Sequence, residues 1–106
     1  MLLTKENRRN LEPLGAQDGA GMEAVAYVKF FGSGRWTFYA TEYDGADTFF
    51  GYCVSALGPD CDELGYLSFG ELKKLRFPPF GLPAERDRHF RPVKLSAIIN
   101  GNGAHA

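Results

Sequence analysis

The pattern of apolar and polar positions predicts four short strands in the middle of the chain. Residues 24–31 are rich in β-branched and aromatic side chains, and residues 35–42 alternate between two sides. One side of this second strand carries Trp36, Phe38 and Ala40, and the other carries Arg35, Thr37, Tyr39 and Thr41. Residues 49–56 and 64–67 predict a third and a fourth strand. Glycine-containing connections between them favour an antiparallel meander.

Short helices are predicted on either side of the strands. Thr4 is suited to cap a helix over residues 5–11, and Ser68 with Glu71 has capping-box spacing before a second helix. Pro78 stops that helix, and residues 83–92 predict one charged helical turn. The predicted fold class is α+β, a short four-stranded antiparallel meander with an N-terminal and a C-terminal helix packed on one face. Residues 1–99 form a single domain, and residues 100–106 form a flexible tail.

Composition narrows the class of protein. The chain has 106 residues, of which 44% are hydrophobic, and this suffices for one domain with a buried core. A net charge of −1 argues against binding to nucleic acid by bulk electrostatics. The chain shows no signal peptide and no apolar run of membrane-spanning length, so we expect a cytoplasmic protein. Cys53 and Cys61 fit no metal spacing and are expected to be free thiols, with the reactivity of Cys61 left open.

A run of acidic residues without lysine or arginine follows the second strand. Its six carboxylates are Glu42, Asp44, Asp47, Asp60, Asp62 and Glu63. In a meander, the loops before and after the third strand lie at its opposite ends, roughly 25 Å apart at about 3.3 Å per residue. We therefore expect two separate acidic loops that face solvent. The alternative is that they form a docking surface for a basic partner.

Two other groups of residues are candidate sites. The densest ionisable cluster is Glu85, Arg86, Asp87, Arg88 and His89. Its charged side chains suit contact with a partner, whereas a hydrolase would require Glu85, Asp87 and His89 to converge in a pocket. The second group is Tyr27, Lys29, Arg35 and Tyr39. On an open sheet face, the two tyrosines could stack on the bases of single-stranded nucleic acid, and the two cations could neutralise its phosphates. The alternative for that face is ordinary packing.

No motif for catalysis, metal binding or cofactor binding is present, so we expect a protein that is not an enzyme and uses no cofactor or metal. The glycine-rich residues 15–21 lie between a helix and a strand. A phosphate-binding loop has the reverse order, strand before and helix after. We therefore interpret residues 15–21 as a connector.

Several short motifs, taken in order, resemble a known bacterial family. They are residues 2–5 (LLTK), 28–31 (VKFF), 36–42 (WTFYATE), 49–51 (FFG), 63–68 (ELGYLS), 71–72 (EL) and 81–87 (GLPAERD), with Phe90 and Pro92. This combination resembles the domain of unknown function numbered 2958 over roughly residues 2–98. Members are typically encoded on conjugative plasmids and integrative elements, near anti-restriction genes. The resemblance implies an accessory role in the transfer or establishment of a mobile element, and it carries over no catalytic residues.

These observations lead to two hypotheses about function. The first is a non-enzymatic protein that binds and inhibits or modulates a host nucleic-acid-processing or defence complex, of the anti-restriction or anti-CRISPR type. The second is a single-stranded nucleic-acid-binding protein that acts in plasmid transfer through Tyr27 and Tyr39. The identity of the partner stays open. The oligomeric state stays open too, because an exposed edge strand could also pair with a second copy.

Overall fold

The structure is a computed structural model that describes residues 2–32, 36–55 and 62–99. Arg35, Asp60, Cys61 and the predicted tail lie outside these residues. In chain order the elements are α1 (Lys5–Asn10), the 3-10 helix η1 (Gly21–Glu23), β1 (Val25–Ala26), β2 (Val28–Phe31), β3 (Thr37–Tyr43), β4 (Thr48–Val54), β5 (Glu63–Ser68), α2 (Phe69–Lys74), β6 (Arg76–Phe77), β7 (Leu82–Pro83), β8 (Glu85–Arg86), β9 (Val93–Lys94) and α3 (Leu95–Ile99).

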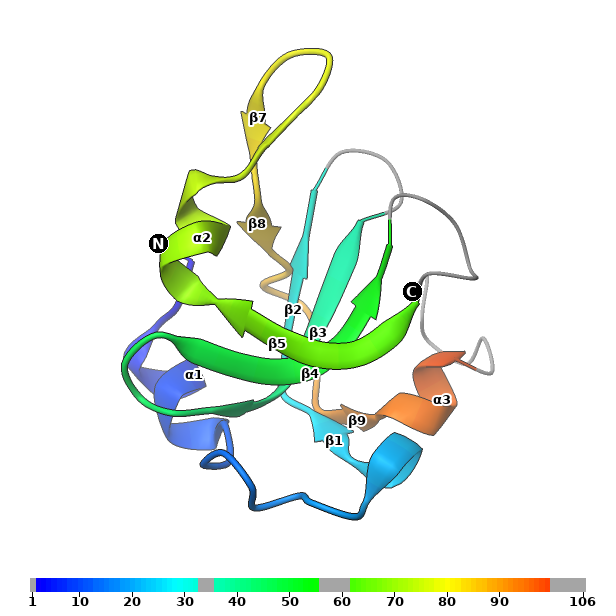
Figure 1. The fold of residues 1–106 in the computed structure, drawn as a ribbon. Coiled ribbons are helices and arrows are strands. Elements are labelled where there is room, and N and C mark those ends of the chain that lie inside the picture. The colour runs from blue at the N-terminus through cyan, green and yellow to red at the C-terminus, as the bar shows by residue number, and fades with distance from the viewer. Residues whose placement is uncertain (1, 33–35, 56–61, 100–106) are drawn as a thin grey trace.

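The main sheet has five strands in the order β5-β4-β3-β2-β8, and all neighbours are antiparallel (Figure 1). Strands β2 to β5 form the predicted meander. Two short strand pairs, β1-β9 and β6-β7, accompany the sheet. The molecule is therefore a mixed α/β domain with a mostly antiparallel sheet.

Two predictions are wrong at β8. This strand is a fifth member of the sheet for which four strands were predicted, and it lies within residues 83–92, for which a helical turn was predicted. Phe30 pairs with Arg86 and Phe31 with Glu85, and the Asp87 N–H donates to the Lys29 carbonyl at 2.9 Å. The outer edge of β2 offers backbone donors and acceptors that need partners. Local charge alternation suggested a helix, but this long-range pairing determines the conformation.

The capped helices follow the sequence signals. The Thr4 hydroxyl accepts from the Asn7 N–H at 3.0 Å, and the Asn7 side chain accepts from the Thr4 N–H at 3.1 Å. The Ser68 hydroxyl accepts from the Glu71 N–H at 3.2 Å at the start of α2. Side-chain oxygens therefore satisfy the first free N–H groups of both helices, as predicted.

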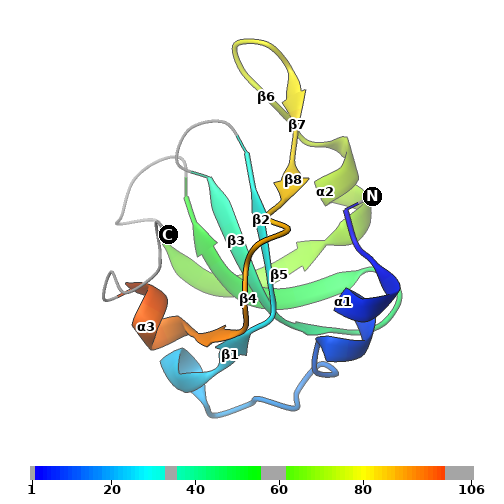
Figure 2. The same ribbon diagram turned by 180° about the vertical axis from the view of Figure 1, so that it is seen from behind.

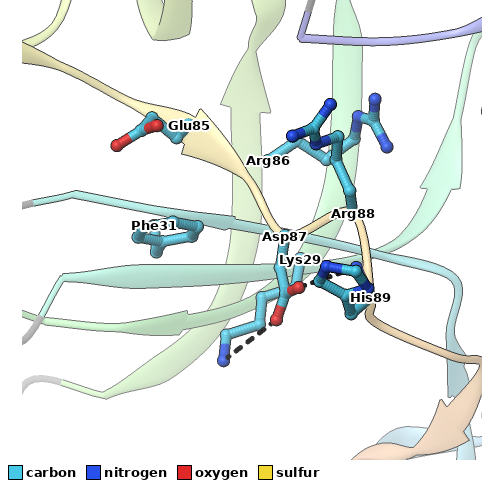
Figure 3. A pocket seen from close by; sticks show the side chains of 7 residues that line it. All are labelled: Lys29, Phe31, Glu85, Arg86, Asp87, Arg88 and His89. Atoms are coloured by element: carbon cyan, nitrogen blue, oxygen red, sulfur yellow. Dashed lines mark hydrogen bonds and ion pairs between the residues drawn. The ribbon is translucent and has the colours of Figure 1, made fainter.

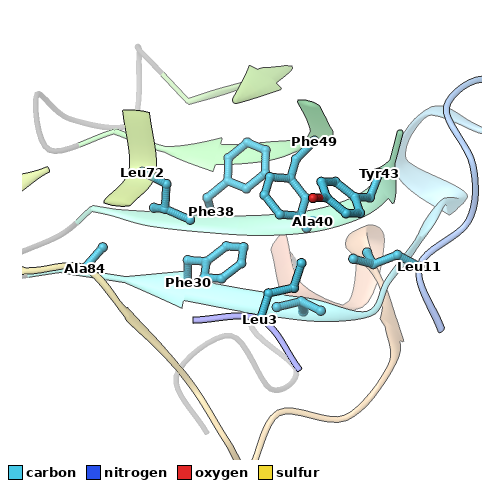
Figure 4. Close-up of a cluster of buried hydrophobic side chains, with 10 residues drawn as sticks. Leu3, Leu11, Phe30, Phe38, Ala40, Tyr43, Phe49, Leu72 and Ala84 are labelled. Atoms are coloured by element: carbon cyan, nitrogen blue, oxygen red, sulfur yellow. The ribbon is translucent and has the colours of Figure 1, made fainter. Parts of the chain in front are cut away.

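One face of the sheet carries the larger core (Figure 4). Phe30, Phe38 and Phe49 are buried there, and the Phe49 ring stacks on Tyr43 with centroids 4.4 Å apart. Leu72 of α2 packs on the same cluster, as do leucines on both sides of α1, Leu3 and Leu11. The predicted inward orientation of Trp36, Phe38 and Ala40 is confirmed, with Trp36 at the margin.

The other face of the sheet is also covered. Its buried cluster is Ala24, Ala26, Tyr39, Leu95 and Ile98, and the last two residues belong to α3. The β1-β9 pair and the bond from the Leu95 N–H to the Ala24 carbonyl at 2.9 Å hold α3 in place. The prediction placed helices on one face and did not include α3. Packing on both faces explains why the alternating positions of β3 are buried on either side.

The hairpin formed by β6 and β7 projects from the body of the molecule (Figures 1 and 2). We call residues 76–83 the projecting hairpin. At its base the Phe77 ring packs on Trp36, with centroids 5.5 Å apart, and fills the space beside Gly32. At its tip Phe80 is 81% exposed. The sequence predicted only that the prolines stop α2, whereas the helix ends at Lys74 and β6 lies between it and Pro78.

Candidate functional site

Glu42 is buried and is bonded within the molecule. It is 3% exposed, and its carboxylate accepts from the N–H groups of Gly15 at 2.9 Å and Gln17 at 2.7 Å. The Gln17 side chain continues the network by accepting from the Val25 N–H at 2.7 Å and donating to the Thr41 carbonyl at 3.1 Å. Glu42 thereby fastens the glycine-rich connector to the sheet. Its predicted place in an exposed acidic surface is wrong, because a register shift after Ala40 leaves it buried.

Asp44 and Asp47 are exposed but are bonded within the molecule. The Asp44 carboxylate accepts from the N–H groups of Ala46, Asp47 and Thr48 at 2.8, 2.8 and 3.0 Å, and these bonds lower its pKa. The Ser68 hydroxyl and the Gly70 N–H donate to Asp47 at 2.6 and 2.7 Å, and they lower the pKa of that carboxyl. These two carboxylates organise the β3-β4 connection and join it to the start of α2.

Of the remaining acidic residues, Asp62 and Glu63 are described, and they lie at the other end of β4. Thr48 pairs with Ser68 at one end of this strand, whereas Cys53 pairs with Glu63 at the other end. Asp62 accepts from the Ser55 N–H at 2.8 Å near the second end. The prediction of two separate acidic loops is confirmed for the described residues, and Asp60 lies outside them. The acidic run therefore forms no single site.

The proposed nucleic-acid face at Tyr39 is closed. Tyr39 is 3% exposed, packs against Phe90 with ring centroids 5.9 Å apart, and has a pKa raised mainly by burial. Lys29 lies on the same side, with its Nζ 5.8 Å from the centre of the Tyr39 ring. Tyr27 packs against the opposite cluster. The prediction that Tyr27 and Tyr39 form one stacking face is wrong, because the chain shifts between β1 and β2 and Phe90 covers Tyr39.

The chain after the projecting hairpin forms a depression of about 400 Å³ (Figure 3). Its lining includes Lys29, Glu85, Asp87 and His89. Asp87 accepts from the His89 N–H at 2.9 Å and lies 3.8 Å from the Lys29 ammonium. The Glu85 side chain points away from both Asp87 and His89 (Figure 3). The three residues line one depression but do not converge, so the arrangement of Glu85, Asp87 and His89 required by the hydrolase alternative is not formed.

The same chain segment borders two further depressions. One of about 300 Å³ separates it from α1, and one of about 320 Å³ lies beside Leu2. Arg86 is held in place, since its Nε donates to the Leu2 carbonyl at 3.1 Å. Arg88 and Arg91 are exposed and make no side-chain bond within the described part of the chain. We take residues 84–92, called segment 84–92 below, as the candidate functional site.

Two features of the surface were not found from the sequence. One is the projecting hairpin, for which the prolines and Gly81, with φ of +66°, were the available signal. The other is a charge asymmetry. Residues 2–11 and 69–92 hold nine of the twelve lysines and arginines and four of the thirteen carboxylates, a net charge of +5. The rest of the chain has a net charge of −6.

Within the described residues, no group of three or more His, Cys, Asp and Glu side chains is arranged to hold a metal ion. The helices described here include none that is long and apolar enough to cross a membrane. A family model with the description "Protein of unknown function (DUF2958)" matches residues 2–102. No curated protein and no solved structure shows significant similarity to the chain.

Proposed function

Because the chain belongs to the DUF2958 family of proteins of unknown function, we propose that it is a non-enzymatic accessory protein of a mobile element. In this proposal it acts in the cytoplasm by binding a host nucleic-acid-processing or defence complex, which it inhibits or modulates. The mobile-element setting is what the resemblance to this family implies. The mode of action is supported by the properties of segment 84–92.

Segment 84–92 combines an ordered backbone with arginines that have no ion-pair partner among the described residues. Pairing of β8 with β2 fixes its backbone, and the bonds of Asp87 and Arg86 fix two of its side chains. Arg88, His89 and Arg91 project from this fixed backbone and are exposed. A partner would therefore meet a preordered backbone at β8, and the conformational entropy lost on binding would come mainly from ordering the free arginine side chains. This combination is the observation that carries the proposal.

Binding accounts for the carboxylates better than catalysis does. Asp87 is occupied by Lys29 and by the His89 N–H, and Glu85 points away from them. Glu42, Asp44 and Asp47 are bonded to the backbone of their own chain. General acid–base catalysis requires a carboxyl or imidazole aimed at a place where substrate can sit. We propose accordingly that the protein catalyses no reaction and requires no cofactor.

The test is affinity capture from a nuclease-treated bacterial lysate, with the captured proteins identified by mass spectrometry. We expect the wild-type protein to recover a component of a nuclease, restriction or CRISPR complex. The double variant Arg88→Glu/Arg91→Glu should lose at least ten-fold in recovery, because truncating or reversing interfacial charges costs on the order of 2 kcal/mol or more. Recovery of no such component by the wild type would remove the proposal.

The matched control is Lys94→Glu. Lys94 is also an exposed cation, but it lies in β9 and pairs with Glu23 at 3.3 Å. Its reversal changes the net charge in the same direction and leaves segment 84–92 intact. Equal losses in Lys94→Glu and in the double variant would show that overall charge, and not this segment, governs capture.

A further inference from the structure

We propose that the projecting hairpin and the basic side chains of α1 and α2 form a binding site for single-stranded nucleic acid. This surface is separate from Tyr39, which is buried, and from segment 84–92. It goes beyond binding to a protein partner and does not depend on it. The ligand would be a phosphate backbone held by Arg8, Lys73 and Lys74, with a base stacked on Phe80.

The fold brings the cations of two helices together. The Arg8 guanidinium lies 5.9 Å from the centre of the Phe69 ring, and the Lys73 ammonium lies 4.8 Å from the same centre. Two cations are therefore gathered on one ring although residues 8 and 73 are far apart in sequence. The projecting hairpin, α2 and α1 follow one another along the same side of the molecule in both views (Figures 1 and 2).

Carboxylates near this surface do not cancel its charge. Asp44 and Asp47 lie close to the start of α2 and offset part of the charge, since their bonds to N–H groups favour the ionised carboxylates and the charge of Asp47 acts on Lys73. Glu6 and Glu71 are exposed on the helices themselves. With Glu6, Glu71, Asp44 and Asp47 all counted, the six lysines and arginines of α1, α2 and the projecting hairpin still outnumber the four carboxylates.

The aromatic tip is held out from the body of the protein. Phe77 anchors the base of the projecting hairpin on Trp36 and against Gly32, and β6 pairs with β7. Phe80 is 81% exposed and Leu82 is 51% exposed beyond this anchor. An exposed phenylalanine costs solubility and gives no core stability. A base has an aromatic face that such a ring can cover.

The combination favours single-stranded nucleic acid over other anionic partners. A cationic surface beside an exposed ring matches the two components of sequence-tolerant single-strand binding, phosphate neutralisation and base stacking. In a duplex, the bases are already stacked on each other and are not available to Phe80 without distortion. An anionic membrane would use the same charges and the same apolar tip, and the experiment distinguishes it.

The experiment measures fluorescence anisotropy of a labelled oligothymidine of about 20 nucleotides, long enough for one small binding domain. We expect binding that weakens steeply between about 50 and about 200 mM salt, because counterions are released from the phosphates. Phe80→Ala should weaken binding about 5- to 100-fold, and Phe80→Trp should restore it. Lys73→Gln/Lys74→Gln should lower the salt slope by roughly one to two.

Two controls match these variants. Tyr66→Ala removes another exposed aromatic ring, which is 73% exposed on β5, and Lys94→Gln removes an exposed lysine distant in the fold from α2. Phe80 is too exposed for its loss to unfold the protein, and thermal unfolding of the variant verifies this. The inference is wrong if no binding occurs at low salt, or if Phe80→Ala binds like Tyr66→Ala. Equal affinity for duplex, or binding only to vesicles of anionic phospholipid, would also overturn it.

Discussion

At the scale of single residues, Glu42 shows how one buried carboxylate organises a distant segment. Its two oxygens accept from the N–H groups of Gly15 and Gln17, 27 and 25 positions away in sequence. The connector at residues 15–21 contains no buried apolar side chain. Its position therefore depends on hydrogen bonds, and Glu42 provides the charged acceptor.

We predict that Glu42→Ala destabilises the protein by about 3–6 kcal/mol, because two N–H groups lose an acceptor worth about 1.5–3 kcal/mol each. Urea unfolding measures this change. Glu63→Ala is the matched control, since Glu63 is exposed, and it should change stability by less than about 0.5 kcal/mol. Equal effects of the two substitutions would show that the clamp on the connector is unimportant.

The lowered pKa values of Asp44 and Asp47 predict a pH dependence. A carboxyl whose pKa in the folded protein lies below its ordinary value of 3.8 adds stability above that value. This stability is lost as the pH falls through the lower folded value. The wild type should therefore lose more stability between pH 7 and about pH 3 than Asp44→Asn/Asp47→Asn does.

Urea unfolding at the two pH values tests this, with Asp18→Asn as a control in another exposed loop. The control should retain the pH dependence of the wild type. An unchanged pH dependence in the double variant would contradict the bonds that Asp44 and Asp47 make in the structure.

Sequence reasoning at this scale identified residue types but not their partners. The acidic run was visible, yet Glu42 could be separated from Asp44 only by knowing that β3 shifts register after Ala40. Likewise, the sequence predicted that Tyr39 and Phe38 point to opposite faces of the sheet. That Phe90 covers Tyr39 could be known only from the fold. Burial depends on contacts between distant segments, and local pattern does not specify them.

At the scale of elements, the projecting hairpin depends on the fit between one glycine and one aromatic ring. A Cβ atom added at Gly32 would overlap the Phe77 ring. Gly32 follows β2, and Phe77 belongs to β6, so this contact joins the projecting hairpin to the main sheet. Trp36 contacts the same ring, with centroids 5.5 Å apart.

We predict that Gly32→Ala costs about 1–3 kcal/mol and shifts the fluorescence of Trp36, because the Phe77 ring must move. Gly65→Ala is the matched control, since Gly65 is also a glycine of the sheet region but a Cβ there meets no atom within 4 Å. In a Phe77→Ala background the additional cost of Gly32→Ala should largely disappear. An equal cost in both backgrounds would refute the contact.

The elements themselves were partly predictable. Local signals gave α1, α2 and the four strands of the meander, because caps, alternation and turns are encoded within a few residues. They did not give β8 or α3. The conformation of Glu85 and Arg86 follows from pairing with β2, and Leu95 and Ile98 are helical where they pack on Tyr39.

At the scale of the whole molecule, the fold separates charge that the sequence distributes along the chain. The net charge of −1 is the sum of a charge of +5 on residues 2–11 and 69–92 and a charge of −6 on the rest of the chain. Contacts of Arg8 with Phe69 and of Arg86 with Leu2 bring these two segments together. A binding partner would therefore meet a basic side at these two segments, and the overall charge is a poor guide to the chemistry of such a partner.

Photo-cross-linking tests whether segment 84–92 contacts a protein partner, as proposed. A benzophenone amino acid placed at position 89 projects from this segment, and the same group at Asp18 serves as the control. We predict covalent adducts with a component of a host nucleic-acid-processing or defence complex from position 89 and none from position 18. The absence of adducts at position 89, or the same adducts from both positions, would contradict the claim.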